Sequence, residues 1–301
     1  MRLFLFSFFA LFTLSICAQN VDSVYMRAHY DKVEYQIPMR DGTKLFTLMY
    51  VPKDKSKTYP ILLNRTPYNA SSYANFKTYG HPSKYLVQDG YILAFQDVRG
   101  RYMSEGQYNN MTPNIAGNDP KNKKAIDESS DTWDSIDWMV KNVKGNNGKV
   151  GIYGISYPGF YSAAALPDAH PALKAASPQA PTADYYMGDD VYHNGAFMLS
   201  ANFGFYSSFV PREGGPEPRK PRLQFNPGTP DGYEFYLNMG PLATVNERLL
   251  KGEAKYWQEI IDHTTYDEYW KSRSLWRFMN NVRCAVLNVG GWFDAEDPVG
   301  P

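Results

Sequence analysis

A six-residue motif, Gly-Ile-Ser-Tyr-Pro-Gly at residues 154–159, limits the folds open to this chain more than any other segment. The apolar run at residues 150–153 precedes it, and the small, helix-prone stretch at residues 160–166 follows it. A strand that passes through a glycine-bounded turn into a helix is a basic unit of α/β folds. Pro158 fits as an early helical residue, because an N–H in the first helical turn has no partner within the helix. The motif therefore predicts a sheet with crossover helices.

Other segments extend this alternation of strands and helices. Residues 33–39 and 43–51 flank an Arg-Asp-Gly turn and predict a hairpin, since Asp-Gly supplies the positive φ that a tight turn needs. Residues 130–143 carry apolar side chains at helical spacing, and Gly145 follows as a stop signal. The short apolar runs typical of buried parallel strands are residues 61–63, 91–95, 150–153 and 285–289.

The pattern of strands stops after Ala180. Residues 185–280 contain no clear buried strand, and the six prolines of residues 211–232 predict a loop. Helices are expected at residues 245–261 and again from about residue 266, behind a Thr-x-x-Glu capping box at residues 265–268. We therefore expect a helical insertion that forms a cap over the sheet, after which the strand at residues 285–289 returns to the core.

The first residues of the chain predict export. One positive charge and an apolar run at residues 3–16 precede Ala18, which is typical of a secretory signal peptide cleaved after that alanine. The run is shorter than the about 20 residues of a transmembrane helix. Acylation of Cys17 would give a lipoprotein instead, but Ile16 is bulkier than such sites usually carry. We expect a periplasmic or secreted protein and favour it over a lipid-anchored one.

Composition excludes several classes of protein. The 31 basic and 31 acidic side chains leave no net charge, which argues against a nucleic-acid or anionic-membrane partner. Two cysteines exclude a disulfide-rich scaffold and a multi-cysteine metal site. Neither a histidine–carboxylate cluster at ligand spacing nor a phosphate-binding glycine loop is present, so neither a metal nor an organic cofactor is expected. The oligomeric state stays open and is compatible with a homo-oligomer.

Ser156, at the tip of the predicted strand–turn–helix unit, is the candidate nucleophile. Glycines on both sides allow a strained turn that lifts the serine oxygen clear of the sheet, and the helix that follows points its first amides at a developing oxyanion. A bare Gly-x-Ser is common by chance, and an ordinary strand-to-helix turn is the alternative. The second glycine stands one residue later than in the usual Gly-x-Ser-x-Gly, and Tyr157 follows the serine.

Several further motifs occur along the chain. They are Met-Arg-Asp-Gly (39–42), Arg-Thr-Pro-Tyr (65–68), Gln-Asp-Val-Arg-Gly-Arg (96–101), Ser-Glu-Gly (104–106) and Asp-Ser-Ile-Asp-Trp (134–138). With Gly-x-Ser-Tyr-x-Gly they resemble the CocE/NonD serine hydrolases, grouped around X-Pro dipeptidyl-peptidases, cocaine esterase and, most similar here, the α-amino acid ester hydrolases. This resemblance, from about residue 33 onward, implies an α/β-hydrolase fold. The predicted division is a signal peptide (1–18), an incomplete α/β-hydrolase core (19–184 and 281–301) and a helical cap (185–280).

The resemblance also implies catalytic roles. An oxyanion in acyl transfer needs two donors, which the family pattern makes the Tyr157 amide and the Tyr68 hydroxyl. The alternative for Tyr68 is an ordinary loop tyrosine. Asp294, just past the strand at residues 285–289, is implied as the acid that orients a catalytic histidine. The polar residues of segment 97–101 are interpreted as a structural ion-pair loop and not as catalysts.

A second implied feature is a carboxylate cluster. In the α-amino acid ester hydrolases, three carboxylates hold the α-ammonium group of the substrate, and the resemblance places them at Asp190, Glu296 and Asp297. Crowded carboxylates repel one another, so a cationic group would stabilise the cluster. A solvated acidic loop is the alternative for Glu296 and Asp297.

The expected catalytic histidine is missing. In α/β-hydrolases the triad runs Ser, Asp, His along the chain, whereas every histidine here precedes Asp294. We therefore expect the sequence to stop before the catalytic histidine, short of the last core strand, the histidine loop and the β jelly-roll domain that the family carries. The alternative is a rearranged triad that uses His170, His193 or His263.

Together these features predict a serine hydrolase that cleaves ester or amide bonds through an acyl-enzyme. Its acyl groups would carry a free α-amino group, so its partner would be a small-molecule ester, an amide or a short peptide. An X-Pro dipeptidyl-peptidase is the alternative within the same class. A ligand-binding fragment without turnover is the alternative from a different class.

Overall fold

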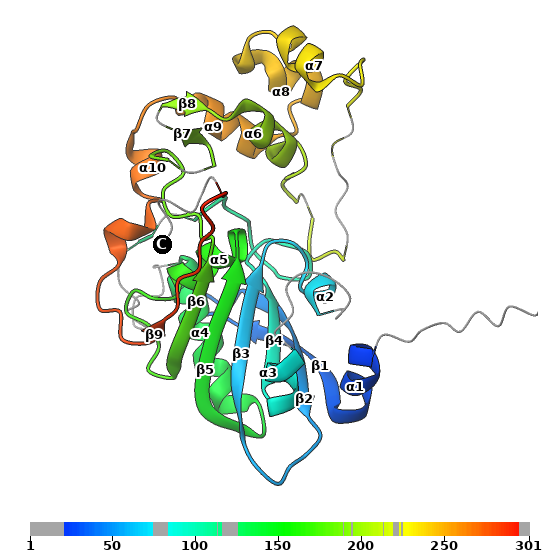
Figure 1. Cartoon of the computed structure of the whole chain (residues 1–301), viewed down its shortest axis with the longest axis vertical. Helices are drawn as coiled ribbons and strands as arrows, with labels where there is room; N and C mark the ends of the chain where they lie inside the picture. The colour runs from blue at the N-terminus through cyan, green and yellow to red at the C-terminus, as the bar shows by residue number, and fades with distance from the viewer. Residues whose placement is uncertain are drawn as a thin grey trace, which may run out of the picture.

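A computed structural model describes residues 21–74, 84–112, 114–115, 126–188, 190–193, 195–212, 214–218, 223 and 225–294. Over these residues the main sheet has seven strands in the order β1-β2-β4-β3-β5-β6-β9 (Figure 1). The first two form an antiparallel hairpin, and the other five run parallel to one another. The strands are β1 (Tyr30–Pro38), β2 (Lys44–Pro52), β3 (Tyr59–Thr66), β4 (Ile92–Asp97), β5 (Asn146–Ile155), β6 (Leu173–Gln179) and β9 (Ala285–Val286).

The β1–β2 hairpin confirms the turn predicted at Asp-Gly. Gly42 has a φ of 87°, and its N–H donates to the carbonyl oxygen of Met39 at 2.9 Å. The alternation of buried and exposed residues is clearest in β1, where Ile37 is buried and its neighbours are exposed. The hairpin thus covers one edge of the parallel strands.

Helices complete the α/β core. The helices of this part are α1 (Val21–His29), α2 (Ala70–Tyr73), α3 (Lys84–Asp89), α4 (Glu128–Asn142) and α5 (Tyr157–Ala164). Helix α4 confirms the helix predicted at residues 130–143, and its N-terminus is closed by a reciprocal capping box between Asp127 and Ser130. Ile136 and Met139 of this helix are buried against the sheet.

Strand β6 is a feature that the sequence analysis missed. Lys174 and Pro178 interrupt its apolar character, and proline argues against a central strand. The strand forms because β5 pairs with it on one side, with Gly154 opposite Pro178. On the other side the carbonyl oxygen of Pro178 accepts from the Val289 N–H at 3.1 Å, so the proline faces the short edge strand β9.

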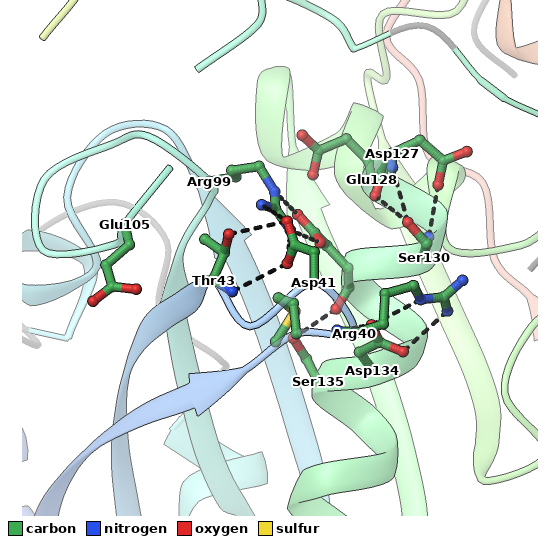
Figure 2. A network of polar contacts seen from close by, with 12 residues as sticks. Arg40, Asp41, Thr43, Arg99, Glu105, Asp127, Glu128, Ser130, Asp134 and Ser135 are labelled. Atoms are coloured by element: carbon green, nitrogen blue, oxygen red, sulfur yellow. Dashed lines mark hydrogen bonds and ion pairs between the residues drawn. The ribbon is translucent and has the colours of Figure 1, made fainter. Parts of the chain in front are cut away.

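An ion-pair network fixes the hairpin turn to helix α4 (Figure 2). The guanidinium of Arg99 lies 2.7 Å from a carboxylate oxygen of Asp41 and 2.7 Å from one of Asp131. Arg40 donates to Asp134 through its backbone N–H at 2.8 Å and through its side chain at 2.9 Å. Arg99 therefore forms the structural ion pairs that were expected of segment 97–101.

Most of the chain between β6 and β9 lies above the carboxyl ends of the parallel strands, and its last residues return beside the sheet to the start of β9 (Figure 1). Its core is aromatic, and Phe203, Tyr256 and Trp257 are buried in it. Its elements are β7 (Tyr192–His193), β8 (Ala196–Phe197), α6 (Leu199–Tyr206), α7 (Gly232–Asn238), η1 (Leu242–Thr244), α8 (Val245–Leu250), α9 (Lys255–Asp262), α10 (Glu268–Lys271) and η2 (Leu275–Phe278).

Two local predictions for this segment are wrong. The single helix expected at residues 245–261 is divided into α8 and α9, because Lys251 and Gly252 adopt φ values of 57° and 74°. The expected Thr265–Glu268 capping box does not form. Asp267 is the N-cap of α10, and its carboxylate accepts from the Tyr269 N–H at 3.0 Å, so Glu268 is already the first helical residue.

The predicted signal peptide, with Cys17, lies outside the described residues. Among the residues that are described, no helix has both the length and the apolar character needed to cross a membrane.

Candidate active site

Ser156 connects β5 to α5 in a strained conformation. Its φ of 61° and ψ of −124° lie in a region that residues with side chains rarely adopt. The backbone holds it there: the Ser156 N–H donates to the Gln179 carbonyl at 2.9 Å, and the Ser156 carbonyl accepts from the Phe160 N–H at 3.0 Å. Its hydroxyl does not cap the helix. The serine therefore occupies the tip of the turn, as the motif predicted.

The two glycines of the motif are required by close packing. A Cβ on Gly154 would lie 2.1 Å from the Pro158 carbonyl oxygen, inside the turn itself. A Cβ on Gly159 would lie 2.5 Å from the carbonyl oxygen of Gln179, at the end of β6. The second glycine therefore stands where helix α5 touches the neighbouring strand, which explains why its position, one residue late, is compatible with the turn.

A cavity of about 250 Å³ lies beside Ser156. The turn between β5 and α5 contributes Ser156 and Tyr157 to its wall, and the loop after β3 contributes Tyr68. The segment above the sheet contributes the rest, including Asp190 and Phe205. The site thus forms between the carboxyl ends of the strands and the helices that cover them, where ligands of α/β proteins usually bind.

Tyr68 is half-buried, and aromatic rings surround it. Its ring makes edge-to-face contacts with Tyr157, Phe205 and Phe209 at centroid distances of 6.2, 6.5 and 6.1 Å. Its backbone N–H donates to the Thr66 hydroxyl at 3.0 Å. The structure therefore places Tyr68 in the same cavity as Ser156, and its role as an oxyanion donor stays a prediction.

The side chain of Tyr157 has a role that the sequence analysis missed. Its buried hydroxyl accepts from the Tyr108 hydroxyl and from the Met111 N–H at 2.8 Å, and donates to Asn110 Oδ1 at 2.9 Å. Burial raises the pKa of Tyr157 far above its usual value, so the phenol stays protonated. The hydroxyl thus anchors segment 108–111 to helix α5, whereas the sequence analysis expected a role only for the backbone amide of Tyr157.

The three members of the predicted carboxylate cluster differ in what the structure says of them. Asp190 is half-buried and lines the cavity, and its carbonyl oxygen accepts from the Asn202 amide at 2.8 Å. Glu296 and Asp297 lie outside the described residues. One of the three is thus placed in the same cavity as Ser156, and the cluster as a whole stays a prediction.

Asp294 and Ser156 both follow the carboxyl ends of parallel strands, at the same end of the sheet. The end of β6 joins the two regions: Gln179 accepts from Ser156, and the Ala180 N–H donates to the Val289 carbonyl at 2.7 Å. Asp294 follows in an exposed loop, where its N–H donates to Gly291 at 2.9 Å. It does not line the cavity, and its role as triad acid stays a prediction.

None of the histidines that the structure describes lines the cavity. His170 precedes β6 and so lies near the amino ends of the parallel strands, opposite to Ser156. Its ring accepts from the Ala172 N–H at 3.0 Å and approaches Asp137 at 3.4 Å. Burial lowers the pKa of His170. His263 is 2.7 Å from Asp267 and stacks on Tyr269. His81 lies outside the described residues.

A mostly parallel sheet, a positive-φ serine between strand and helix, and a cap over the strand ends define an α/β-hydrolase fold. Residues 41–299 match the family described as X-Pro dipeptidyl-peptidase (S15 family), which is most of the chain. The chain belongs to this family.

Similar proteins support this assignment. Cocaine esterase from Rhodococcus sp. (strain MB1 Bresler) is 28% identical over 267 residues, which are 86% of this chain and 43% of that protein. The crystal structure of an aminopeptidase from a marine sediment archaeon (Thaumarchaeota archaeon) is 34% identical with a TM-score of 0.77, covering 89% of this chain and 44% of the other. An α-amino acid ester hydrolase structure is 33% identical with a TM-score of 0.74, covering 97% and 48%. The chain thus spans less than half the length of these relatives.

Proposed function

We propose that the whole protein is a serine hydrolase that forms an acyl-enzyme on Ser156. The observation that carries this proposal is the strained turn that presents Ser156 to a cavity shared with Tyr68 and Asp190. The serine oxygen would attack the substrate carbonyl, and the resulting oxyanion would accept from the Tyr157 N–H and the Tyr68 hydroxyl. Collapse of this intermediate would expel the alcohol or amine, and water would then release the acid.

The general base in this proposal is a histidine that the 301 residues do not supply in the expected order. It would take the serine proton, pass it to the leaving group and be oriented by Asp294. We propose that it belongs to a further part of the whole protein. Support comes from the relatives, of whose length this chain covers 43% to 48%.

For the substrate we propose acyl groups that carry a free α-amino group. Asp190 lines the cavity, and a carboxylate in a partly desolvated site attracts an ammonium group. Glu296 and Asp297 would complete the binding site for this group. The similarity to an α-amino acid ester hydrolase supports this choice. The family description favours an X-Pro dipeptidyl-peptidase as the second candidate, since its substrates also present a free amine.

A substrate panel on the protein as its gene encodes it tests the proposal. Phenylglycine methyl ester should be hydrolysed, its N-acetyl form should not, and Ser156→Ala should abolish turnover. Asp190→Asn should lower kcat/KM for the free-amine ester by about 10- to 100-fold, as expected for the loss of an ion pair in a partly desolvated site. Glu253→Gln, an exposed acid of the cap, is the matched control.

The other outcomes separate the alternatives. Cleavage that requires proline at the second position would identify the dipeptidyl-peptidase. Ligand binding without turnover or acylation of Ser156 would identify the non-catalytic alternative. Retained turnover in Ser156→Ala would exclude the serine mechanism altogether.

We also propose that the protein is exported and that residues 1–18 are removed. Mass spectrometry of the native protein should then find Gln19 at the N-terminus. An acylated Cys17 at that position would identify a lipoprotein instead.

A further inference from the structure

The loop that carries Tyr68 is held from outside at two points of its backbone. Nε of Arg101 donates to the carbonyl oxygen of Pro67 at 3.0 Å, immediately before the tyrosine. Oδ1 of Asp97 accepts from the N–H of Ala70 at 2.7 Å, two residues after it. Both holding side chains come from the end of β4 and the turn that follows. The backbone position of Tyr68 therefore depends on one buried guanidinium and one buried carboxyl group.

Asp97 joins this loop to its own turn. The side chain is fully buried at the carboxyl end of β4, and its second oxygen accepts from the Met103 N–H at 3.1 Å. The carboxyl group of Asp97 thus connects the loop that carries Tyr68, through Ala70, to the turn after β4, through Met103. Neither contact involves the cavity, so Asp97 cannot touch a substrate there.

Arg101 reaches a third segment. Its side chain is 3% exposed, and Nη1 lies 3.5 Å from the carbonyl oxygen of Val210. The guanidinium carbon lies 4.2 Å from the ring centre of Phe209, which also packs edge-on against Tyr68. We call residues 209–212 and 214–218, which follow α6, the cap linker. Arg101 contacts the Tyr68 loop and the cap linker at the same time.

Further hydrogen bonds join the same segments. Asn69, with a φ of 84°, donates through its side-chain amide to the Pro218 carbonyl at 3.1 Å. Arg212 donates to the Tyr102 carbonyl at 2.6 Å. The cap linker is therefore docked both on the residue that follows Tyr68 and on the turn that holds its loop.

We propose that Arg101 and Asp97 are positioning residues for the Tyr68 hydroxyl, and that Arg101 couples its orientation to the seating of the cap linker. This inference rests on the proposed function. An oxyanion donor must lie within a few tenths of an ångström of its position in the transition state, so a shift of its loop slows acylation. Lysine cannot replace Arg101, because a single ammonium cannot donate to Pro67 and also spread over the Phe209 ring.

The test is a double-mutant cycle between Arg101→Lys and Tyr68→Phe. The rate measured is acylation of Ser156 by phenylglycine methyl ester, the free-amine ester of the proposed function, in the protein as its gene encodes it, with kcat and KM determined separately. Tyr68→Phe alone should slow acylation by about 10²- to 10³-fold, the usual effect of losing one oxyanion donor. Arg101→Lys alone should lower kcat by about 10- to 100-fold with little change in KM, as expected for a misplaced catalytic group. In the Tyr68→Phe background it should cost no more than about 3-fold, since coupled residues are not additive.

Arg99→Lys is the matched control. Arg99 lies two residues away in the same turn, but its ion pairs are with Asp41 and Asp131 and not with the Tyr68 loop. Its effect, of whatever size, should be the same with and without the tyrosine hydroxyl. Phe209→Leu provides a milder second variant if Arg101→Lys fails to fold, and it should show the same non-additivity with Tyr68→Phe.

The outcomes separate the inference from the function beneath it. If Ser156 is not acylated in the unaltered protein, the proposed function fails. If acylation occurs and Tyr68→Phe slows it, but the effects of Arg101→Lys and Tyr68→Phe multiply, only the positioning role is wrong. An unchanged rate in both Arg101→Lys and Phe209→Leu would also overturn it.

Discussion

The hydroxyl of Tyr157 accepts a hydrogen bond from the N–H of Met111 at 2.8 Å, across 46 residues of sequence. The residue next to the candidate nucleophile is thereby attached to the long segment that follows β4. The same hydroxyl bonds to Tyr108 and Asn110, so one buried phenol satisfies three polar groups. Tyr157 therefore has two different roles. Its side chain stabilises the turn, and its backbone amide is the expected oxyanion donor.

Tyr157→Phe should destabilise the protein more than it slows the reaction. It leaves three buried polar groups without their partner, and the free energy of unfolding should fall by about 1–3 kcal/mol. The backbone amide remains, so acylation of Ser156 should slow by less than about 10-fold, well under the effect of losing an oxyanion donor. Urea unfolding measures the first effect, with Tyr233→Phe, an exposed tyrosine, as the control. An equal stability in the two variants would contradict the prediction.

Gly159→Ala should destabilise the turn that carries Ser156. The added methyl group would lie 2.5 Å from the Gln179 carbonyl oxygen, and helix α5 or β6 must shift to accept it. We expect a loss of about 1–3 kcal/mol in the free energy of unfolding, or failure to fold. Gly204→Ala is the control, since this helical glycine of α6 has nothing within 4 Å of the new Cβ. That variant should be unchanged or more stable by up to about 1 kcal/mol. Similar melting temperatures for both would show that the predicted clash is absent.

His170→Asn should keep the activity of the protein. The ring lies near the amino ends of the parallel strands, opposite to Ser156, and the asparagine oxygen can accept from the Ala172 N–H in place of the ring nitrogen. Stability should fall by about 1 kcal/mol because the ring also packs against Trp133. Steady-state hydrolysis is the measurement, and His29→Asn, at an exposed histidine outside the three triad alternatives, is the control. A loss of turnover by 100-fold or more in His170→Asn alone would revive the rearranged triad.

Asp97 should make stability fall as pH rises toward neutrality. Burial raises its pKa to about 7, against the hydrogen bonds from Ala70 and Met103 and the charges of Arg101 and Arg212, which lower it. Between about pH 4 and 7 the native state then holds a proton that the unfolded chain has released, so the contribution of Asp97 to the free energy of unfolding declines by up to about 1.4 kcal/mol per pH unit. Subtracting the pH profile of Asp97→Asn from that of the unaltered protein isolates this slope.

Asp41→Asn is the opposite case and serves as its control. Burial acts to raise the pKa of Asp41, but the hydrogen bond and charge of Arg99 lower it to a value below its usual range. Its stabilising contribution should be present at neutral pH and disappear only as pH falls through the acid range. If both variants gave the same pH difference profile, the assignment of the slope to Asp97 would be wrong.

Segments with strong local signals were predictable from the sequence. The Asp-Gly hairpin turn, the apolar face of α4 and the glycine-bounded turn at Ser156 each depend on residues that are close in sequence. Strand β6 and the break between α8 and α9 were not. Pro178 is tolerated because of its neighbours in the sheet, and Lys251 takes a left-handed conformation that its sequence does not require. Tertiary contacts outweigh local propensity at such positions.

The candidate nucleophile could be predicted from the sequence alone, because a strand–turn–helix unit is determined by residues that are adjacent in sequence. The sequence also sufficed for the kind of fold, because periodic apolar runs reflect which side of each element is buried. The assembly of the site required the tertiary structure. Tyr68, Asp190 and Ser156 come from three separate parts of the chain, and the contacts of Arg101 with Pro67 and Phe209 arise only after the cap has closed over the sheet. Such contacts depend on how elements that are distant in sequence pack together, so the spacing of residues along the chain does not predict them.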